Sequence, residues 1–175
     1  EDGSVRMLVY RQNIDAEKRR ELFLFEKMQQ DSLTGLYNKA ATQEQIRSRL
    51  KIYPDGSFAF FILDIDDFKQ VNDRFGHAAG DQVLVKFART VKAQFPGDGD
   101  VVGRIGGDEF VAFERIEDRA AAEEKARSLT EVLCRGVDTD AGICNMTASV
   151  GVAVSPSGGT DFETLYKNAD TALYH

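Results

Sequence analysis

The sequence predicts an α+β domain with a central, largely antiparallel sheet and helices packed against it. The first observation is the order of the elements expected from residue 39 onward, which is helix, strand, helix, helix, strand, strand, helix, strand and helix. The second is a pair of apolar runs on either side of residues 106–109, which indicates two short strands joined by a tight turn. The third is composition, because 175 residues of which 42% are hydrophobic can bury one full core.

Residues 1–30 differ in pattern from the rest of the chain. A strand-like stretch at 5–10 leads into a charged segment at 15–20, after which apolar residues recur at helical spacing, namely Leu22, Phe25 and Met28. We interpret this part as the end of an upstream module, such as a sensor domain, followed by a connecting helix. The alternative is a simple N-terminal helix that packs on the domain's own core.

The main domain is expected at residues 31–175. A turn-rich junction at 31–38 precedes a helix at 39–50, a buried-strand pattern covers 57–65, and a short helix follows as far as Phe75. Gly76 and Gly80 are expected to end this helix, and Asp81 is a suitable N-cap for the next one. That long amphipathic helix has an apolar stripe that consists of Leu84, Phe87, Ala88, Val91 and Phe95.

The second half of the domain completes the sheet. A loop at 96–100 leads into the two short strands around residues 106–109. An alanine-rich stretch at 118–133 predicts a helix, residues 146–154 predict a strand, and residues 162–174 predict a closing helix.

Charge and cysteine content narrow the functional classes. A formal net charge of −7 argues against a nucleic-acid-binding surface, which needs a basic stripe. The charge does not argue against a nucleotide bound through metal ions, since the metal supplies positive charge. The longest apolar run, 58–63, is too short to cross a bilayer, so we expect a cytoplasmic domain without membrane contact. Cys134 and Cys144 are expected to be reduced, and His77 and His175 are too few and too distant for a zinc site.

The segment Gly106-Gly107-Asp108-Glu109-Phe110 is the most informative part of the chain. Two adjacent carboxylates point to opposite faces of a regular strand, but at a turn where glycine permits positive φ they can converge. Converging carboxylates form a site for a hard cation, and such a cation suggests phosphate chemistry. The alternative is a solvated hairpin with an acidic tip.

A second acidic segment follows the strand expected at 57–65. The strand ends in Asp64, Asp66 and Asp67, and the helix after it has Lys69 in its first turn. Strand ends next to helix N-termini favour phosphate binding, because free amides and the helix dipole attract anions. Asp64 is the best metal ligand, since the backbone is still fixed at the strand's exit. Asp67 could instead be a helix cap, and Lys69 could be a solvated helix lysine.

Asn72 and Asp81 are the candidates for reading a base. Guanine presents the acceptor O6 beside N–H donors, so an amide and a carboxylate together can match its edge. In the alternative interpretation, Asn72 ends its helix and Asp81 caps the next.

Five segments in this order and spacing resemble the GGDEF family of diguanylate cyclases: DSLTGLYN at 31–38, LDIDDFKQVNDRFGHAAGD at 63–81, RIGGDEF at 104–110, SVGVA at 149–153 and NADTALY at 168–174. The resemblance covers about residues 31–175. It implies a fold similar to the palm of polymerases and class III nucleotide cyclases. It also implies a reaction that condenses two GTP molecules into cyclic di-GMP, with one GTP on each of two domains that face each other in a homodimer.

The resemblance also implies residue roles. Asp64, the Ile65 carbonyl and Asp108 would bind two Mg²⁺ or Mn²⁺ ions per active site, and Glu109 would be a metal ligand or the general base for the ribose 3′-hydroxyl. Lys69 would act on the β- and γ-phosphates. The full set of implied substrate contacts is Asp67, Phe68, Lys69, Asn72, His77, Asp81, Gly106 and Gly107.

The sequence departs from the family pattern at the usual product-inhibition motif, R-x-x-D. Gly97 stands at the arginine position, while Asp100 keeps the aspartate position. A carboxylate without its arginine is a poor clamp for a dinucleotide phosphate, so we expect weak product inhibition there. The family usually continues after ALY with a lysine and, four residues on, an arginine, and neither is present in this sequence. The alternative to an active cyclase is a catalytically weak GTP-binding regulatory or interaction module of the same fold.

Overall fold

The computed structural model describes residues 17–21 and 23–173, and the chain divides into two compact units between Gln30 and Asp31. The division falls at the boundary that the sequence predicts. In the first unit, residues 17–21 and 23–28 are helical, and the large apolar side chains of this helix are exposed: Phe23, Leu24, Phe25 and Met28. The strand expected at 5–10 lies outside the described residues, and the assignment of the first unit to an upstream module stays a prediction.

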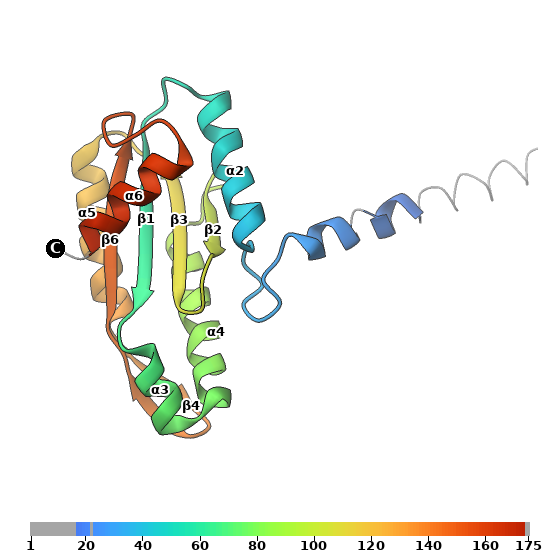
Figure 1. Cartoon of the computed structure of the whole chain (residues 1–175), viewed down its shortest axis with the longest axis vertical. Helices are drawn as coiled ribbons and strands as arrows, with labels where there is room; N and C mark the ends of the chain where they lie inside the picture. The colour runs from blue at the N-terminus through green and yellow to red at the C-terminus, as the bar shows by residue number, and fades with distance from the viewer. Residues whose placement is uncertain (1–16, 22, 174–175) are drawn as a thin grey trace, which may run out of the picture. The chain divides into compact units, whose positions relative to one another are not determined.

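The second unit is built around a four-stranded sheet with the strand order β2-β3-β1-β6 (Figure 1). Every neighbouring pair in this sheet is antiparallel. The strands are β1 (Phe58–Ile65), β2 (Val101–Arg104), β3 (Glu109–Arg115) and β6 (Ala148–Ser155). The antiparallel sheet flanked by helices confirms the predicted fold class.

Helices cover both faces of the sheet. One core layer packs α2 (Lys39–Ile52) and α6 (Phe162–Leu173) on the sheet, and the other packs α3 (Phe68–Phe75), α4 (His77–Gln94) and α5 (Arg119–Leu133). Strand β1 supplies Phe60 and Ile62 to the first layer and Phe61 and Leu63 to the second. Because both faces of β1 are buried, the strand is a continuous apolar run rather than an alternating one.

The long helix α4 begins five residues earlier than predicted, with Gly76 rather than Asp81 at the N-cap position. Gly76, at φ 82°, separates α3 from α4, whereas Gly80 lies inside α4 and does not end a helix. The predicted N-cap role of Asp81 is therefore wrong, since Asp81 is an exposed residue of the second turn. Gly80 has a packing reason instead: a Cβ on this residue would lie 2.0 Å from Oδ1 of Asn72.

The sequence interpretation missed a small second sheet, the hairpin of β4 (Gly136–Thr139) and β5 (Gly142–Asn145). Its two strands are short and largely exposed, so they lack the apolar alternation that predicts a strand. The strand expected at 146–154 is β6, which begins two residues later. Among the described residues, no helix is both long enough and apolar enough to span a membrane.

Candidate active site

Two carboxylates face each other across the central strands. In the antiparallel pairing of β1 with β3, Asp64 lies directly opposite Glu109. Side chains alternate along a strand, and Ile62 and Val111 both pack in the layer under α2 and α6. Asp64 and Glu109 therefore project from the same face of the sheet. Like charges in this relation repel each other, so the arrangement is costly unless a cation or a proton intervenes.

The electrostatics of Asp64 reflect this crowding. Burial, and to a lesser extent the negative charges of Asp108, Glu109 and Asp66, together raise the pKa of the Asp64 carboxyl from 3.8 to about 6. A cation bound at this position would reverse the effect and keep the carboxylate ionised.

Asp108 is brought to the same place by the hairpin turn. The Ile65 amide donates to the Asp108 carbonyl at 3.3 Å, which joins the exit of β1 to the turn. The described residues include no group of three or more His, Cys, Asp or Glu side chains arranged to hold a metal ion. The oxygen donors at this corner are the carboxylates of Asp64 and Asp108, to which backbone carbonyls can add. This all-oxygen donor set suits Mg²⁺ or Mn²⁺.

The glycines of the turn do not act as the sequence suggested. Neither Gly106 nor Gly107 adopts a positive φ, so left-handed backbone is not what brings the acids together. Instead, the strand register positions Glu109, and Asp108 precedes the strand. A Cβ on Gly106 would lie 3.1 Å from Cβ and 3.3 Å from Oε2 of Glu109, so this glycine leaves room beside the carboxylate.

The turn is held by Arg104, whose importance the sequence interpretation missed. Its guanidinium donates to the Gly107 carbonyl through Nη2 at 2.6 Å and Nε at 3.1 Å, and it forms an ion pair with Asp31 at 3.2 Å. Burial alone would raise the pKa of Asp31. Hydrogen bonds from Thr34 and Arg104, with the positive charge of Arg104, outweigh burial and hold this pKa below its ordinary value. Arg104 and Asp31 both lie within the segments that resemble the family. Their contact was not predicted, because 73 residues of sequence separate them.

Replacing Arg104 with Ala should destabilise the domain and loosen the acidic turn. The variant loses charge-assisted bonds to Gly107 and leaves the half-buried Asp31 without its cation, so we expect a loss of about 1.5–3 kcal/mol in urea unfolding. Arg104→Lys should recover only part of this, because one ammonium cannot reproduce the planar fork. An unchanged urea midpoint in Arg104→Ala would show that these contacts do not hold the turn.

Asp66 has a different task from its neighbour Asp64. Its two carboxylate oxygens accept hydrogen bonds from Ser149 Oγ and Thr147 Oγ1, each at 2.6 Å, and its amide donates to the Thr147 carbonyl at 3.0 Å. These bonds tie the exit of β1 to the start of β6. Both oxygens of Asp66 are thus engaged within the fold, which leaves Asp64 as the available acid at the strand end.

The start of α3 has an unusual backbone conformation. Asp67 occupies the N-cap position in the left-handed region, at φ 54°, and its side chain makes no cap hydrogen bond within the described residues. The capping interpretation of Asp67 is therefore not supported. A left-handed residue before a helix directs successive amides into one concavity, which suits phosphate oxygens. Lys69 is exposed in the first turn of the same helix.

The two candidates for reading a base, Asn72 and Asp81, lie where α3 and α4 approach each other closely. Asn72 lies against Gly80, and Asp81 is the next residue along α4. The Asn72 carbonyl accepts from the Gly76 amide at 2.9 Å at the end of α3. His77 is exposed at the first position of α4.

Gly97 and Asp100 form a closed turn. The Asp100 carboxylate accepts from the Gly97 amide at 2.8 Å, and the Asp100 amide donates to the Gly97 carbonyl at 2.9 Å. A Cβ at Gly97 would lie 2.9 Å from both carboxylate oxygens. The one acid left from the product-inhibition motif is thus engaged locally, which adds to the reasons for expecting weak product inhibition.

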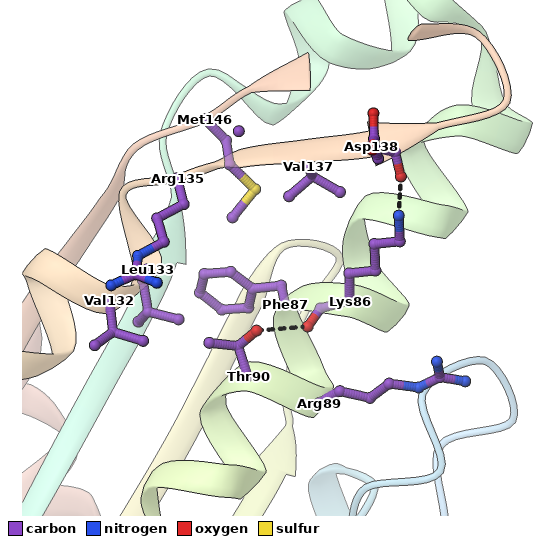
Figure 2. Close-up of a pocket in the computed structure, with 11 residues that line it drawn as sticks. Lys86, Phe87, Arg89, Thr90, Val132, Leu133, Arg135, Val137, Asp138 and Met146 are labelled. Atoms are coloured by element: carbon purple, nitrogen blue, oxygen red, sulfur yellow. Dashed lines mark hydrogen bonds between the residues drawn. The ribbon is translucent and has the colours of Figure 1, made fainter. Parts of the chain in front are cut away.

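Two cavities of the domain lie away from the paired acids Asp64 and Glu109. A cavity of about 420 Å³ lies between α4, α5 and β4, and the side chains of Phe87, Val137 and Met146 are among those that line it (Figure 2). Figure 2 also shows Lys86 directed at the Asp138 carbonyl, to which it donates a hydrogen bond. A neighbouring cavity of about 460 Å³ includes Asp81 in its lining. The described residues that line either cavity do not include the paired acids, so the chemistry of the carboxylates, not cavity size, identifies the candidate site.

The fold and the site define an α+β domain with an antiparallel sheet and acids gathered at the ends of its central strands, and the comparisons identify the family. The family model for the diguanylate cyclase GGDEF domain matches residues 28–175. The chain therefore belongs to this GGDEF family.

Curated relatives come from several bacteria. The bifunctional diguanylate cyclase/cyclic di-GMP phosphodiesterase MucR of Pseudomonas aeruginosa is 33% identical over 147 residues, which are 83% of this chain and 21% of MucR. The cyclic di-GMP phosphodiesterase PdeR of Escherichia coli is 35% identical over 147 residues, 82% of this chain and 22% of PdeR. The chain spans about a fifth of the length of the curated relatives that it matches.

Solved structures share the fold. A sensory box/GGDEF family protein from Caulobacter crescentus superposes with a TM-score of 0.78 at 35% identity, covering 83% of this chain and 96% of that one. The diguanylate cyclase SiaD of Pseudomonas aeruginosa, solved with its activator SiaC, has a TM-score of 0.77 at 29% identity, covering 98% of this chain and 67% of SiaD.

Proposed function

We propose that this domain is a diguanylate cyclase, which condenses two GTP molecules into cyclic di-GMP and two pyrophosphates. The observation that carries the proposal is the placement of Asp64 opposite Glu109 with Asp108 beside them. Family membership supports it, because the signature Gly106–Phe110 is intact in sequence. The regulatory alternative would not need three acids held in mutual repulsion.

The proposed division of labour follows from the positions of the residues. Asp64, Asp108 and the Ile65 carbonyl would hold two Mg²⁺ or Mn²⁺ ions, and Glu109 would complete this set or accept the proton of the 3′-hydroxyl. Bound divalent ions would supply Lewis acidity that activates the 3′-hydroxyl and offsets the charge of the α-phosphate. The amides of Asp67 and Phe68, with Lys69, would orient the outer phosphates. Gly106 and Gly107 would allow the backbone to approach the α-phosphate.

Base choice would fall to the α3–α4 contact. Asn72 and Asp81 supply an amide and a carboxylate on adjoining helices, a pair that can meet guanine O6 and its N–H donors. A site that hydrogen-bonds its substrate rejects analogues that leave buried partners unpaired. His77 begins α4 and would lie near the bound nucleotide.

Two copies of the domain would be needed for each product molecule, since each domain would hold one GTP. A homodimer with two-fold symmetry would bring the two sites face to face. The helix before residue 31, with its exposed apolar residues, is a candidate for raising the local concentration of the two copies.

The proposal is tested by incubating the purified chain with Mg²⁺ and either GTP or ATP over a range of protein concentrations. Cyclic di-GMP should form from GTP, with at least about a hundredfold preference over ATP, and activity per chain should rise with concentration where the chain is monomeric. GTP binding without product would favour the regulatory alternative. Equal use of ATP would remove Asn72 and Asp81 as base readers, and concentration-independent activity of the monomer would exclude the facing dimer.

A further inference from the structure

A tyrosine from the last helix contacts the acid pair. The hydroxyl of Tyr166, on α6, donates a hydrogen bond of 2.6 Å to Oε1 of Glu109, a contact that spans 57 residues of sequence. Tyr166 and Glu109 are both half-buried. A short bond from a hydroxyl to a carboxylate is among the stronger hydrogen bonds in proteins and is strongly directional.

The ring of Tyr166 is fixed by its neighbours. It stacks on Phe162 with a centroid distance of 6.1 Å, and it meets the edge of Phe60 at 6.5 Å with an interplanar angle of 85°. Phe60 and Phe162 are themselves buried in the layer between the sheet and α6. These contacts prevent the ring from swinging away, so its hydroxyl stays aimed at Glu109.

The helix that bears Tyr166 is also seated closely on the sheet. A Cβ on Gly151 of β6 would lie 2.1 Å from the Ala169 carbonyl and 2.8 Å from the Leu173 amide. The glycine therefore lets α6 approach β6 at backbone distance. The hydroxyl is thus delivered by a rigid element rather than by a loop, as a precise site requires.

The two oxygens of Glu109 have different surroundings. Oε1 accepts from Tyr166, while Oε2 lies on the side where Gly106 has no side chain. Without a fixed donor, the carboxylate of Glu109 would rotate away from Asp64, which lies directly opposite it. A donor on Oε1 resists that rotation and leaves Oε2 available for a cation or for a substrate proton.

We propose that Tyr166 is a positioning residue for Glu109, which holds this carboxylate in its working orientation through the hydroxyl at Oε1. The inference rests on the proposed cyclase function for its catalytic consequence, but not for the contact itself. In this proposal Tyr166 acts only through Glu109 and does not itself contact GTP.

The kinetic test compares Tyr166→Phe with the native chain. The variant keeps the ring and its packing and removes only the hydroxyl. We expect kcat for cyclic di-GMP formation to fall about ten- to a hundredfold, because small misplacements of a reacting group are costly, while KM for GTP changes less than about twofold. Tyr53→Phe is the matched control, since Tyr53 is an exposed tyrosine at the end of α2, and it should behave as the native chain.

The packing of α6 is checked in the same variant. If Tyr166 had only a structural role, Tyr166→Phe would lower the urea midpoint and leave kcat unchanged. We expect the opposite pattern, a lowered kcat with a midpoint close to that of the native chain. Native kcat in a folded variant would overturn the inference.

A second test needs no activity. The chain has no tryptophan, so its near-ultraviolet absorbance reports on tyrosines. Glu109→Gln should alter the tyrosine difference spectrum in the native background, because the hydroxyl of Tyr166 loses its carboxyl partner. The same substitution in the Tyr166→Phe background should give no tyrosine signal.

The two tests separate the possible failures. A tyrosine signal that persists in the Tyr166→Phe background, or no signal in the native background, would show that the contact is absent and overturn the inference. A native chain that makes no cyclic di-GMP would refute the proposed function, while the spectrum would still decide whether Tyr166 holds Glu109.

Discussion

Asp64→Asn is expected to reduce cyclic di-GMP formation by on the order of 10³-fold or more. Asp64 lies near the end of β1, directly opposite Glu109. Its backbone is fixed there, because the nearby Asp66 is hydrogen-bonded to the start of β6. Asparagine keeps the shape of the side chain but removes the charge that a divalent cation would require. Turnover of GTP at saturating Mg²⁺ measures the effect, and Asp55→Asn, in the exposed loop before β1, is the charge-matched control.

The same substitution should leave the fold intact and, without divalent cations, stabilise it near neutral pH. The folded-state pKa of Asp64, about 6, lies above its ordinary value of 3.8, so the native state holds this proton more tightly than the unfolded chain. The ionisation of Asp64 therefore costs stability as the pH rises from about 4 through 6. Asp64→Asn lacks this cost, so its Tm should exceed that of the native chain at pH 7 and approach it at pH 4.

Two outcomes would contradict this account of Asp64. Retained turnover in Asp64→Asn would remove the residue from the mechanism. A difference in Tm that does not depend on pH would show that the pKa of Asp64 is not raised in the folded domain.

Gly80→Ala is expected to raise KM for GTP by about tenfold or more while the domain remains stable. The new Cβ would lie 2.0 Å from Oδ1 of Asn72, so that side chain has to move, and the ring of Phe68 would be 3.3 Å away. Moving the end of one flexible side chain is cheap for the fold. Replacing glycine by alanine inside a helix also gains roughly 0.5–1 kcal/mol of stability, which offsets part of the strain.

The role of Asn72 in this effect can be isolated by a double-mutant cycle. If Gly80→Ala acts by displacing Asn72, then adding it to Asn72→Ala should change KM little further, because the group that it displaces is already gone. Isothermal calorimetry with GTP and urea unfolding should be run on all four proteins. A fully additive effect on KM would show that the close approach of α3 and α4 matters for some other reason.

Most of the fold could be predicted because its elements are strongly patterned. The apolar run of β1 and the stripe of α4 from Leu84 to Phe95 are buried as expected. The hairpin β4–β5 could not be predicted, because exposed short strands are not marked by apolar periodicity. The start of α4 was misplaced because Gly80 was interpreted as a helix breaker, when its small size serves the contact with Asn72.

The candidate site shows the same division between local and distant information. The acids at 64 and 108–109 were identified from residue type and their position at strand ends, which are local properties of the chain. The residues that support these acids and their turn were not identified. Tyr166 contacts Glu109 across 57 residues of sequence, and Arg104, which holds the turn, contacts Asp31 across 73. Nothing in the spacing of a sequence encodes such a pair.

The sequence by itself determined the family and the class of fold and indicated the acids of the candidate site, since these depend on residue types at fixed local spacing. Only the tertiary structure decided which acids lie together and which are engaged within the fold. The register of β1 on β3 places Asp64 against Glu109, while hydroxyls from the β6 side engage both oxygens of Asp66. The packing of α6 on the sheet likewise brings the hydroxyl of Tyr166 to Glu109. Register and helix packing are set by the whole core at once, so a short motif cannot specify them.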